Sequence, residues 1–178
     1  METIRKRSLD LIKGRIAEAL VESIFRRALF RMTRFGMESD LRGMLKVGKD
    51  EDFAPDFLAL KESRVAEAPG VYHTFMIEVK YRRDLSRYLE VQSRKGNESV
   101  FAKSKAKWPN LFLIFVTDDP EEGRSCFQVL DLRSYTPGRA VKTAELHGIE
   151  QFQIFPNTVR EYEGLARQIF GVLADFKR

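Results

Sequence analysis

Apolar residues recur along the chain at two spacings, and each spacing predicts a different kind of element. Near the amino terminus the spacing is three or four residues, which is typical of a helix with one buried face. We expect this helix over residues 8–34, with Gly36 ending it. The apolar residues that carry the pattern are Leu9, Ile12, Ile16, Leu20 and Ile24.

A second helix is expected at the carboxyl-terminal end, beginning near Thr158. Thr158 and Glu161 have the spacing of a capping box, in which two side chains accept hydrogen bonds from the first backbone N–H groups. The apolar positions that follow recur at helical spacing and predict a buried stripe. Its members are Tyr162, Leu165, Ala166, Ile169, Leu173 and Phe176.

Shorter apolar runs between these helices predict strands. We expect strands over residues 41–47, 53–60, 71–82, 111–117 and 126–132, with a polar turn over 61–70. Residues 111–117 lack the alternation of a half-exposed strand, which predicts burial on both faces. Helical sequence fills residues 84–107 and is broken at Gly96-Asn97.

The order of these elements predicts an α/β fold with a mixed central sheet flanked by helices. The 178 residues contain no repeat and no linker, so we expect a single domain over residues 1–178. One cysteine, Cys126, excludes an internal disulfide and fits a reducing compartment. The longest apolar run, 111–116, is too short to span a membrane, and residues 1–13 carry no signal sequence. We therefore expect a cytoplasmic protein with no membrane association.

The net charge of +5 is concentrated in one segment. Between Arg82 and Lys107 there are eight bases and three acids, an excess equal to that of the whole chain. Such a segment predicts a docking surface for a phosphate backbone, and a solvated helical face is the alternative. The bases are Arg82, Arg83, Arg87, Arg94, Lys95, Lys103, Lys105 and Lys107.

Two acidic residues border apolar runs in a pattern that favours a metal site. Asp56 precedes the run 57–60, and Glu78 follows the run 72–77, with Lys80 two residues later. Alternation along a strand would place Glu78 and Lys80 on one face, about 7 Å apart at the backbone. A turn aspartate and an exposed charge pair at a strand end are the structural alternatives. The opposite face is expected to pack in the core and consists of Phe75, Ile77, Val79 and Tyr81.

Pro55-Asp56 and Glu78-Val79-Lys80 resemble the motif of the PD-(D/E)XK phosphodiesterases, the restriction endonuclease-like superfamily. The order of elements is similar too, with a leading helix, a strand hairpin that carries the motif, a helix and a buried strand. The resemblance covers residues 8–117 and implies a restriction endonuclease-like core, to which 118–178 add a strand and a carboxyl-terminal helix. It implies a metal-dependent endonuclease that hydrolyses DNA in restriction, repair or recombination.

The resemblance also implies a role for each residue of the motif. Asp56, Glu78 and Lys80 would be catalytic, with Asp56 and Glu78 holding Mg²⁺, for which Mn²⁺ can substitute. Lys80 would orient or help to activate the attacking water and would stabilise the developing negative charge.

Glu18 matches the acid that many members of the superfamily add from the leading helix. It lies among apolar residues, a setting in which a carboxylate needs a cation or another partner. We expect Glu18 to be a third metal ligand, and Glu22, one turn further on, is the alternative. A plain ion pair with Arg15, Arg26 or Lys80 is the interpretation that needs no metal.

DNA is the expected partner, and a cut through both strands would favour a homodimer. The main alternative function is a non-catalytic nucleic-acid-binding module on the same fold, and a weaker one is a protein that binds an acidic partner. Zinc is not expected, because His73 and His147 stand alone. The residues expected to bind DNA are Arg82, Arg83, Arg87, Lys103, Lys105 and Lys107.

Overall fold

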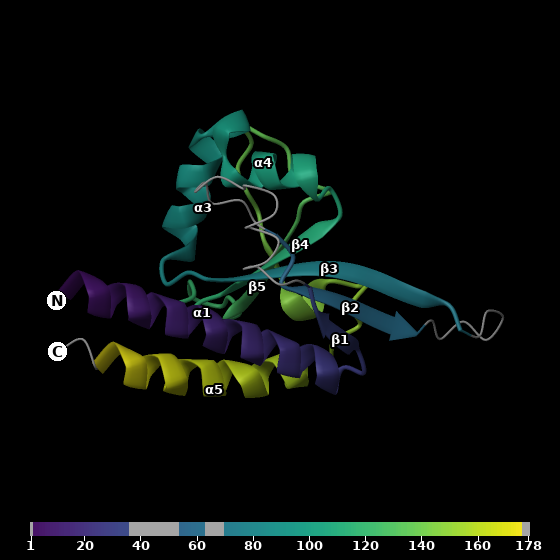
Figure 1. Ribbon diagram of the computed structural model, residues 1–178, viewed down its shortest axis with the longest axis horizontal. Helices are drawn as coiled ribbons and strands as arrows, with labels where there is room; N and C mark the ends of the chain where they lie inside the picture. The colour runs from purple at the N-terminus through teal and green to yellow at the C-terminus, as the bar shows by residue number, and fades with distance from the viewer. Residues whose placement is uncertain (1, 36–53, 63–69, 176–178) are drawn as a thin grey trace.

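The computed structural model describes residues 2–35, 54–62 and 70–175, and within them a six-stranded sheet lies between two layers of helices (Figure 1). The strands are β1 (Arg31–Arg34), β2 (Phe57–Glu62), β3 (Tyr72–Tyr81), β4 (Leu111–Val116), β5 (Phe127–Asp131) and β6 (Ala144–Glu145). The α-helices are α1 (Glu2–Arg27), α3 (Leu85–Arg94), α4 (Val100–Lys107) and α5 (Pro156–Asp175), and the short 3-10 helices are η1 (Gly96–Glu98) and η2 (Leu146–Gly148).

The strands lie in the sheet in the order in which they occur in the chain, from β1 to β6. All neighbouring strands are antiparallel except β3 and β4, which are parallel. A parallel pair needs a long crossover connection, and α3, η1 and α4 supply it. The expected mixed α/β architecture, with a mixed sheet flanked by helices, is therefore confirmed.

Each face of the sheet has its own hydrophobic core. On the face covered by α1 and α5, Phe25 and Phe170 pack with Ile77 of β3. On the face covered by α3 and α4, Phe101 packs with Phe115 of β4. Every residue of β4 is buried, so the predicted burial of this strand on both faces is confirmed.

The first helix ends at Arg27, and the prediction of helix to residue 34 is wrong, because residues 31–34 form β1. Leu29 has a φ of +67°, and the N–H of Phe30 donates to the carbonyl of Phe25 at 3.0 Å. These features define a Schellman turn, and the Phe25 and Phe30 rings complete it with centroids 4.9 Å apart. Glycine normally occupies the left-handed position of this turn. Because leucine stands there instead, the end of the helix could not be predicted from the sequence.

The second strand begins at Phe57 and runs past the predicted end at residue 60 to Glu62. Lys61, expected in a polar turn, is instead buried in β2. Its ammonium group donates to the carbonyl of Phe152 at 2.8 Å and lies 4.7 Å from the centroid of the Phe30 ring. These partners come from distant parts of the chain, which is why the local pattern does not predict them.

The predicted strands 71–82, 111–117 and 126–132 correspond to β3, β4 and β5. The break predicted in the following helical segment is also confirmed, since Gly96 has a φ of +53° between α3 and α4. β6 and η2 were not predicted, because two- and three-residue elements have no recognisable periodicity. The predicted strand 41–47, Gly36 and Phe176 lie outside the described residues.

The last helix, α5, begins at Pro156, so Thr158 lies inside its first turn and the predicted capping box is wrong. Proline suits the first position of a helix because its φ is already helical. The predicted stripe is largely confirmed, because Ala166 is fully buried and Tyr162 and Leu173 pack against the core, beside the buried Val159 and Phe170. Leu165, at 43% exposed, is its wrong member. Among the described helices, including the long α1 and α5, none is apolar enough over sufficient length to cross a membrane.

The Schellman turn generates a prediction about stability. Leu29 is 73% exposed, so its side chain contributes little packing, yet its left-handed backbone is unfavourable for a residue with a Cβ. We expect Leu29→Gly to raise the free energy of unfolding by about 1 kcal/mol relative to Leu29→Ala, measured by urea unfolding. The alanine variant is the control, because it removes the same side chain and keeps the strain. Equal or lower stability of the glycine variant would contradict the assignment.

Candidate active site

Asp56 lies where β2 separates from β3, and its backbone and side chain both bind β3. Its N–H donates to the carbonyl of Ile77 at 2.8 Å, one residue out of the register in which Phe57 pairs with Ile77. The next N–H of β3 to be bound on this side, that of Val79, donates at 2.7 Å to the carboxylate oxygen Oδ2 of Asp56. The side chain of Asp56 thus takes the place of a backbone carbonyl. Pro55, the residue before it, has no N–H with which to extend the ladder. The Asp56 carboxylate is thereby held against the edge of β3.

Glu78 and Lys80 lie on one face of β3, as the alternation predicts, and form an ion pair. Glu78 pairs in register with Leu113 of β4, and Lys80 with Phe115. Glu78 is 1% exposed, whereas the Lys80 side chain is 30% exposed. The alternative of an exposed charge pair at a strand end is therefore wrong for Glu78, which lies at the buried base of the site.

One carboxylate oxygen of Glu78, Oε2, is buried and accepts no hydrogen bond from a donor among the described residues. A buried oxygen of this kind is unfavourable unless a donor or a cation satisfies it. Asp56 is close enough for its charge to raise the pKa of Glu78 further. The two carboxylates are close enough to share a hydrogen bond when one of them is protonated, and together they fit the demands of a hard divalent cation, which needs one or two protein carboxylates.

The pKa values of the three groups are coupled. Burial raises the pKa of Asp56 and raises that of Glu78 well above its usual range, so the metal-free pair retains a proton on Glu78 more readily than on Asp56. Burial alone would lower the pKa of Lys80, but the charge of Glu78 and the hydrogen bond to it outweigh burial, and the net pKa is raised. Lys80 is thus an ammonium group at neutral pH and can act as a donor and a positive charge, not as a base.

The site opens into a cavity of about 570 Å³ between α1 and the end of β3. Asp56 and Lys80 line it from the sheet, and Glu18 lines it from α1. Arg82 and Arg83, the first two bases of the predicted DNA-binding segment, form part of the wall. The cavity therefore brings together the acids, the lysine and two of the predicted phosphate-binding residues.

Glu18 faces this cavity but is held by two arginines. Its carboxylate lies 2.9 Å from Arg15 and 3.2 Å from Arg34, so the ion pair with Arg15, given as the alternative that needs no metal, is present. Its charge also raises the pKa of Asp56, which places the two acids near each other. Glu22, the alternative, pairs with Arg34 at 3.0 Å and does not line the cavity. The pairing with Arg34 was not predicted, because that residue was assigned to the helix.

Asp56 and Glu78 form a pair of possible ligands rather than a group of three. Across residues 2–35, 54–62 and 70–175, no three His, Cys, Asp or Glu side chains come close enough to hold one ion. Glu18 would have to exchange its arginine partners to become a third ligand.

The bases of the segment 82–107 do not form one surface. The N–H of Arg82 donates to the carbonyl of Val116, which places Arg82 and Arg83 at the carboxyl ends of the parallel strands β3 and β4. Lys105 and Lys107 precede the beginning of β4 and so lie towards the other end of this pair. Lys105 also donates to the carbonyls of Arg133 and Tyr135, at 2.9 and 2.8 Å, and anchors that loop.

The sequence prediction missed a buried polar network beside the cavity. Tyr81 packs against Phe170, with ring centroids 4.7 Å apart, which confirms its predicted packing role. Its hydroxyl group also accepts from Lys13 at 3.0 Å and donates to Asp118 at 2.7 Å, and burial raises the pKa of Tyr81. Lys13 is only 4% exposed and lies one turn before the buried Ala17 on α1. The position of Lys13 beside the apolar stripe of α1 is the feature of the sequence that could have predicted its burial.

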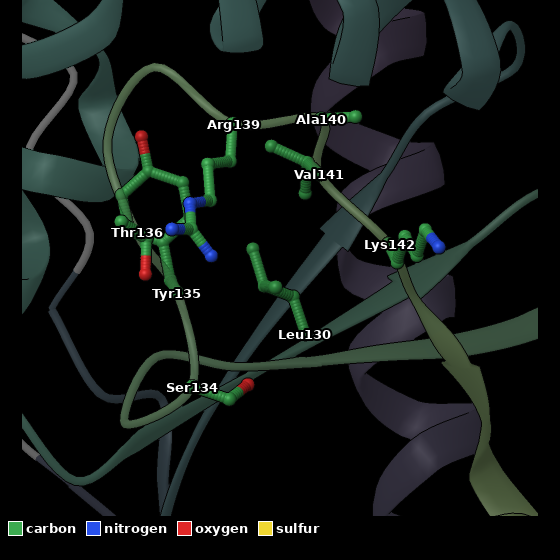
Figure 2. A pocket seen from close by; sticks show the side chains of 8 residues that line it. All are labelled: Leu130, Ser134, Tyr135, Thr136, Arg139, Ala140, Val141 and Lys142. Carbon is green, nitrogen blue, oxygen red and sulfur yellow. The ribbon is translucent and has the colours of Figure 1, made fainter.

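A second, smaller hollow of about 210 Å³ lies between the segment 134–142 and Leu130 of β5 (Figure 2). The guanidinium group of Arg139 turns into it, while the side chain of Lys142 points away. The described residues that line this hollow include no carboxylate, histidine or cysteine, so they offer no group that commonly holds a metal ion or transfers a proton near pH 7.

The raised pKa values of Asp56 and Glu78 give stability a pH dependence of definite sign. The unfolded chain releases these protons at the ordinary values of 3.8 for aspartate and 4.5 for glutamate, whereas the folded protein retains them to higher pH. Their contribution to stability is complete at lower pH and is lost as the pH rises through the folded values. We expect Glu78→Gln to flatten this fall, measured by urea unfolding without divalent metal from about pH 4 to 8.

Glu90→Gln is the matched control, because Glu90 is an exposed acid on α3 that lies outside the cavity. This variant should keep the pH dependence of the wild type. If Glu78→Gln also kept it, Glu78 would not be the group that holds the proton.

Comparison of the chain with protein-family models, curated proteins and solved structures finds no match. The fold is established as mixed α/β with a mixed sheet between helices. Any assignment of function therefore depends on the arrangement of Asp56, Glu78 and Lys80.

Proposed function

We propose that the protein is a metal-dependent phosphodiesterase of the PD-(D/E)XK type, with a restriction endonuclease-like core over residues 8–117, and that it hydrolyses DNA as an endonuclease. One observation carries this proposal. The unsatisfied oxygen of buried Glu78 lies beside Asp56 and Lys80, in a site that opens into a cavity with Arg82 and Arg83 in its wall. A fold that used these acids for stability alone would gain nothing from burying a carboxylate without a complete set of partners.

Asp56 and Glu78 would hold Mg²⁺ or Mn²⁺. A cation bound there would polarise a phosphoryl oxygen and lower the pKa of a bound water. Glu78 must release its proton before it can bind the ion, so metal affinity should rise with pH. Lys80, kept protonated by Glu78, would donate a hydrogen bond to the phosphate or the water and stabilise the negative charge of the transition state.

The remaining predicted residues have graded roles in this proposal. Arg82 and Arg83 line the cavity and would contact the phosphate backbone nearest the cut. Arg87, Lys103, Lys105 and Lys107 would contact DNA further away, because the segment is divided between two ends of the sheet. Glu18 would assist as a third ligand or through a water, after exchange of its arginine partners.

The second candidate is a non-catalytic nucleic-acid-binding module on the same fold. The observation that favours it is the ion pairing of Glu18 with Arg15 and Arg34, which leaves only two described carboxylates for a metal. A homodimer and a cytoplasmic location also belong to the proposal. Two copies would be needed for a cut through both strands, since one such site cuts one strand.

The proposal predicts metal-dependent cleavage that depends on three residues. Purified protein is incubated with supercoiled plasmid, single-stranded DNA and branched DNA, in Mg²⁺, Mn²⁺ or EDTA. We expect cutting with either metal and none with EDTA. The variants Asp56→Asn, Glu78→Gln and Lys80→Met should each lower the cleavage rate by about 100-fold to 1,000-fold, because each removes a ligand or a charge that stabilises the transition state.

Glu90→Gln is again the control and should cut like the wild type, since Glu90 lies on the outer side of α3 with its side chain 59% exposed. A wild type that shifts DNA on a gel but never cuts it would replace the nuclease with the binding module. A wild type that does neither would exclude both.

A further inference from the structure

The cavity extends well beyond the catalytic residues, along the amino-terminal half of α1. Glu18 interacts with Asp56 at one end, and Lys13 contacts Tyr81 nearer the other. These two contacts show that α1 runs antiparallel to β3 along the cavity. The lining continues as far as Asp10 on α1, which is about 12 Å from Glu18 along the helix axis. This length leaves a compartment that the proposed metal site does not use.

Gly14 forms the α1 wall of this compartment. Glycine in the interior of a helix is destabilising relative to alanine, so its presence needs a reason. A Cβ at this position would meet no atom of the described residues within 4 Å, and the backbone of Gly14 does not adopt a positive φ. Neither packing against this part of the chain nor backbone geometry requires glycine here. What its missing side chain provides is open space on the cavity side of α1.

A hydrogen-bond network joins α1 to the wall opposite Gly14. Lys13, next to Gly14 on α1, binds the hydroxyl group of Tyr81, which in turn binds Asp118. This network ties α1 to the end of β3 beside the compartment. Arg82 is also held in place, because it donates to the carbonyl of Tyr81 at 2.8 Å and lies 4.5 Å from the centroid of the Tyr88 ring.

The chemistry of the compartment fits one nucleotide unit. Leu11, 65% exposed at the cavity, offers an apolar surface for a sugar or a base. The guanidinium group of Arg83 makes no hydrogen bond or ion pair with the described residues and is available to a phosphate. Asp10 at the far end would repel a phosphate but can accept a hydrogen bond from a base or a sugar hydroxyl. Together these groups orient the unit, with its phosphate towards Arg83.

We propose that this compartment is the subsite for the nucleotide next to the scissile phosphodiester, and that the nucleic-acid strand crosses α1 at Gly14. The inference rests on the proposed nuclease function and adds a residue that determines access to it. Gly14 contributes by the absence of a side chain, so any larger residue would occupy the space that the strand needs.

The test separates stability from access. Gly14→Ala and Gly14→Leu should both fold, and Gly14→Ala should raise Tm by about 1 to 4 °C, because alanine and leucine favour a helix more than glycine does. Cleavage by Gly14→Leu should fall by about 100-fold or more, with Gly14→Ala between it and the wild type. Ala19→Leu is the matched control, since Ala19 is exposed on the same helix and outside the cavity. It should retain wild-type cleavage.

Binding is measured beside cleavage, with a short fluorescent oligonucleotide, single-stranded or annealed, in Ca²⁺. If Gly14→Leu cuts and binds like the wild type, the subsite is excluded even though the nuclease stands. If the wild type binds DNA without cutting, the nuclease is excluded, and weaker binding by Gly14→Leu than by Ala19→Leu then supports only the path of the strand across α1 at Gly14. Should activity across the Gly14 variants follow Tm rather than side-chain size, or the wild type neither bind nor cut, the inference is overturned.

Discussion

The burial of Glu78 is the constraint on which the rest of the site depends. β4 is apolar throughout and pairs in parallel with β3, so Glu78 has a hydrophobic strand on one side. On the other side β2 departs at Asp56, and the edge of β3 opens into the cavity. A carboxylate in such a position is costly unless it keeps a proton, pairs with a cation or does both. Without a metal, Lys80 stabilises the Glu78 carboxylate by an ion pair, and Asp56 favours its protonated form.

Helix α1 adds a second wall to this site on β3. Its apolar stripe packs on the face of β3 that bears Ile77 and Val79, opposite to the face of Glu78. Its polar residues therefore border the open edge of β3 rather than compete with the core. Lys13 joins α1 to Tyr81 at one position, and Glu18 approaches Asp56 at another. The cavity is the space that remains between these two points.

Sequence reasoning reached the parts of this structure that depend on local periodicity. Alternation along 71–82 correctly placed Glu78 and Lys80 on one face, and the unbroken apolar run correctly marked β4 as buried on both sides. It did not find the end of the first helix, because Leu29 takes a conformation that its residue type disfavours. Of the two partners of Glu18, the sequence suggested Arg15 but not Arg34. Arg34 reaches Glu18 from β1, a strand whose existence follows from that unpredicted turn.

The same limit applies to buried polar groups. The contacts of Lys13 with Tyr81 and of Lys61 with Phe152 join residues separated by 68 and 91 positions. No local sequence pattern predicts such pairs, because they depend on how the helices and loops pack against the sheet. The predicted start of α5 was wrong for a related reason. Pro156 and the conformation of the preceding loop determine where this helix begins, and the hydroxyl group of Thr158 does not.

The pairing of α1 with α5 has a consequence for how the protein is made. Ser23 and Arg27 of α1 bind Tyr162 and Glu161 of α5, so the two helices lie side by side although they come from opposite ends of the chain (Figure 1). All strand pairings join neighbours in sequence, but this contact closes a loop across nearly the whole polypeptide. During synthesis α1 is made before α5, so its remaining side is uncovered until α5 is present. The helix that forms one wall of the cavity is thus synthesised before the helix that packs beside it.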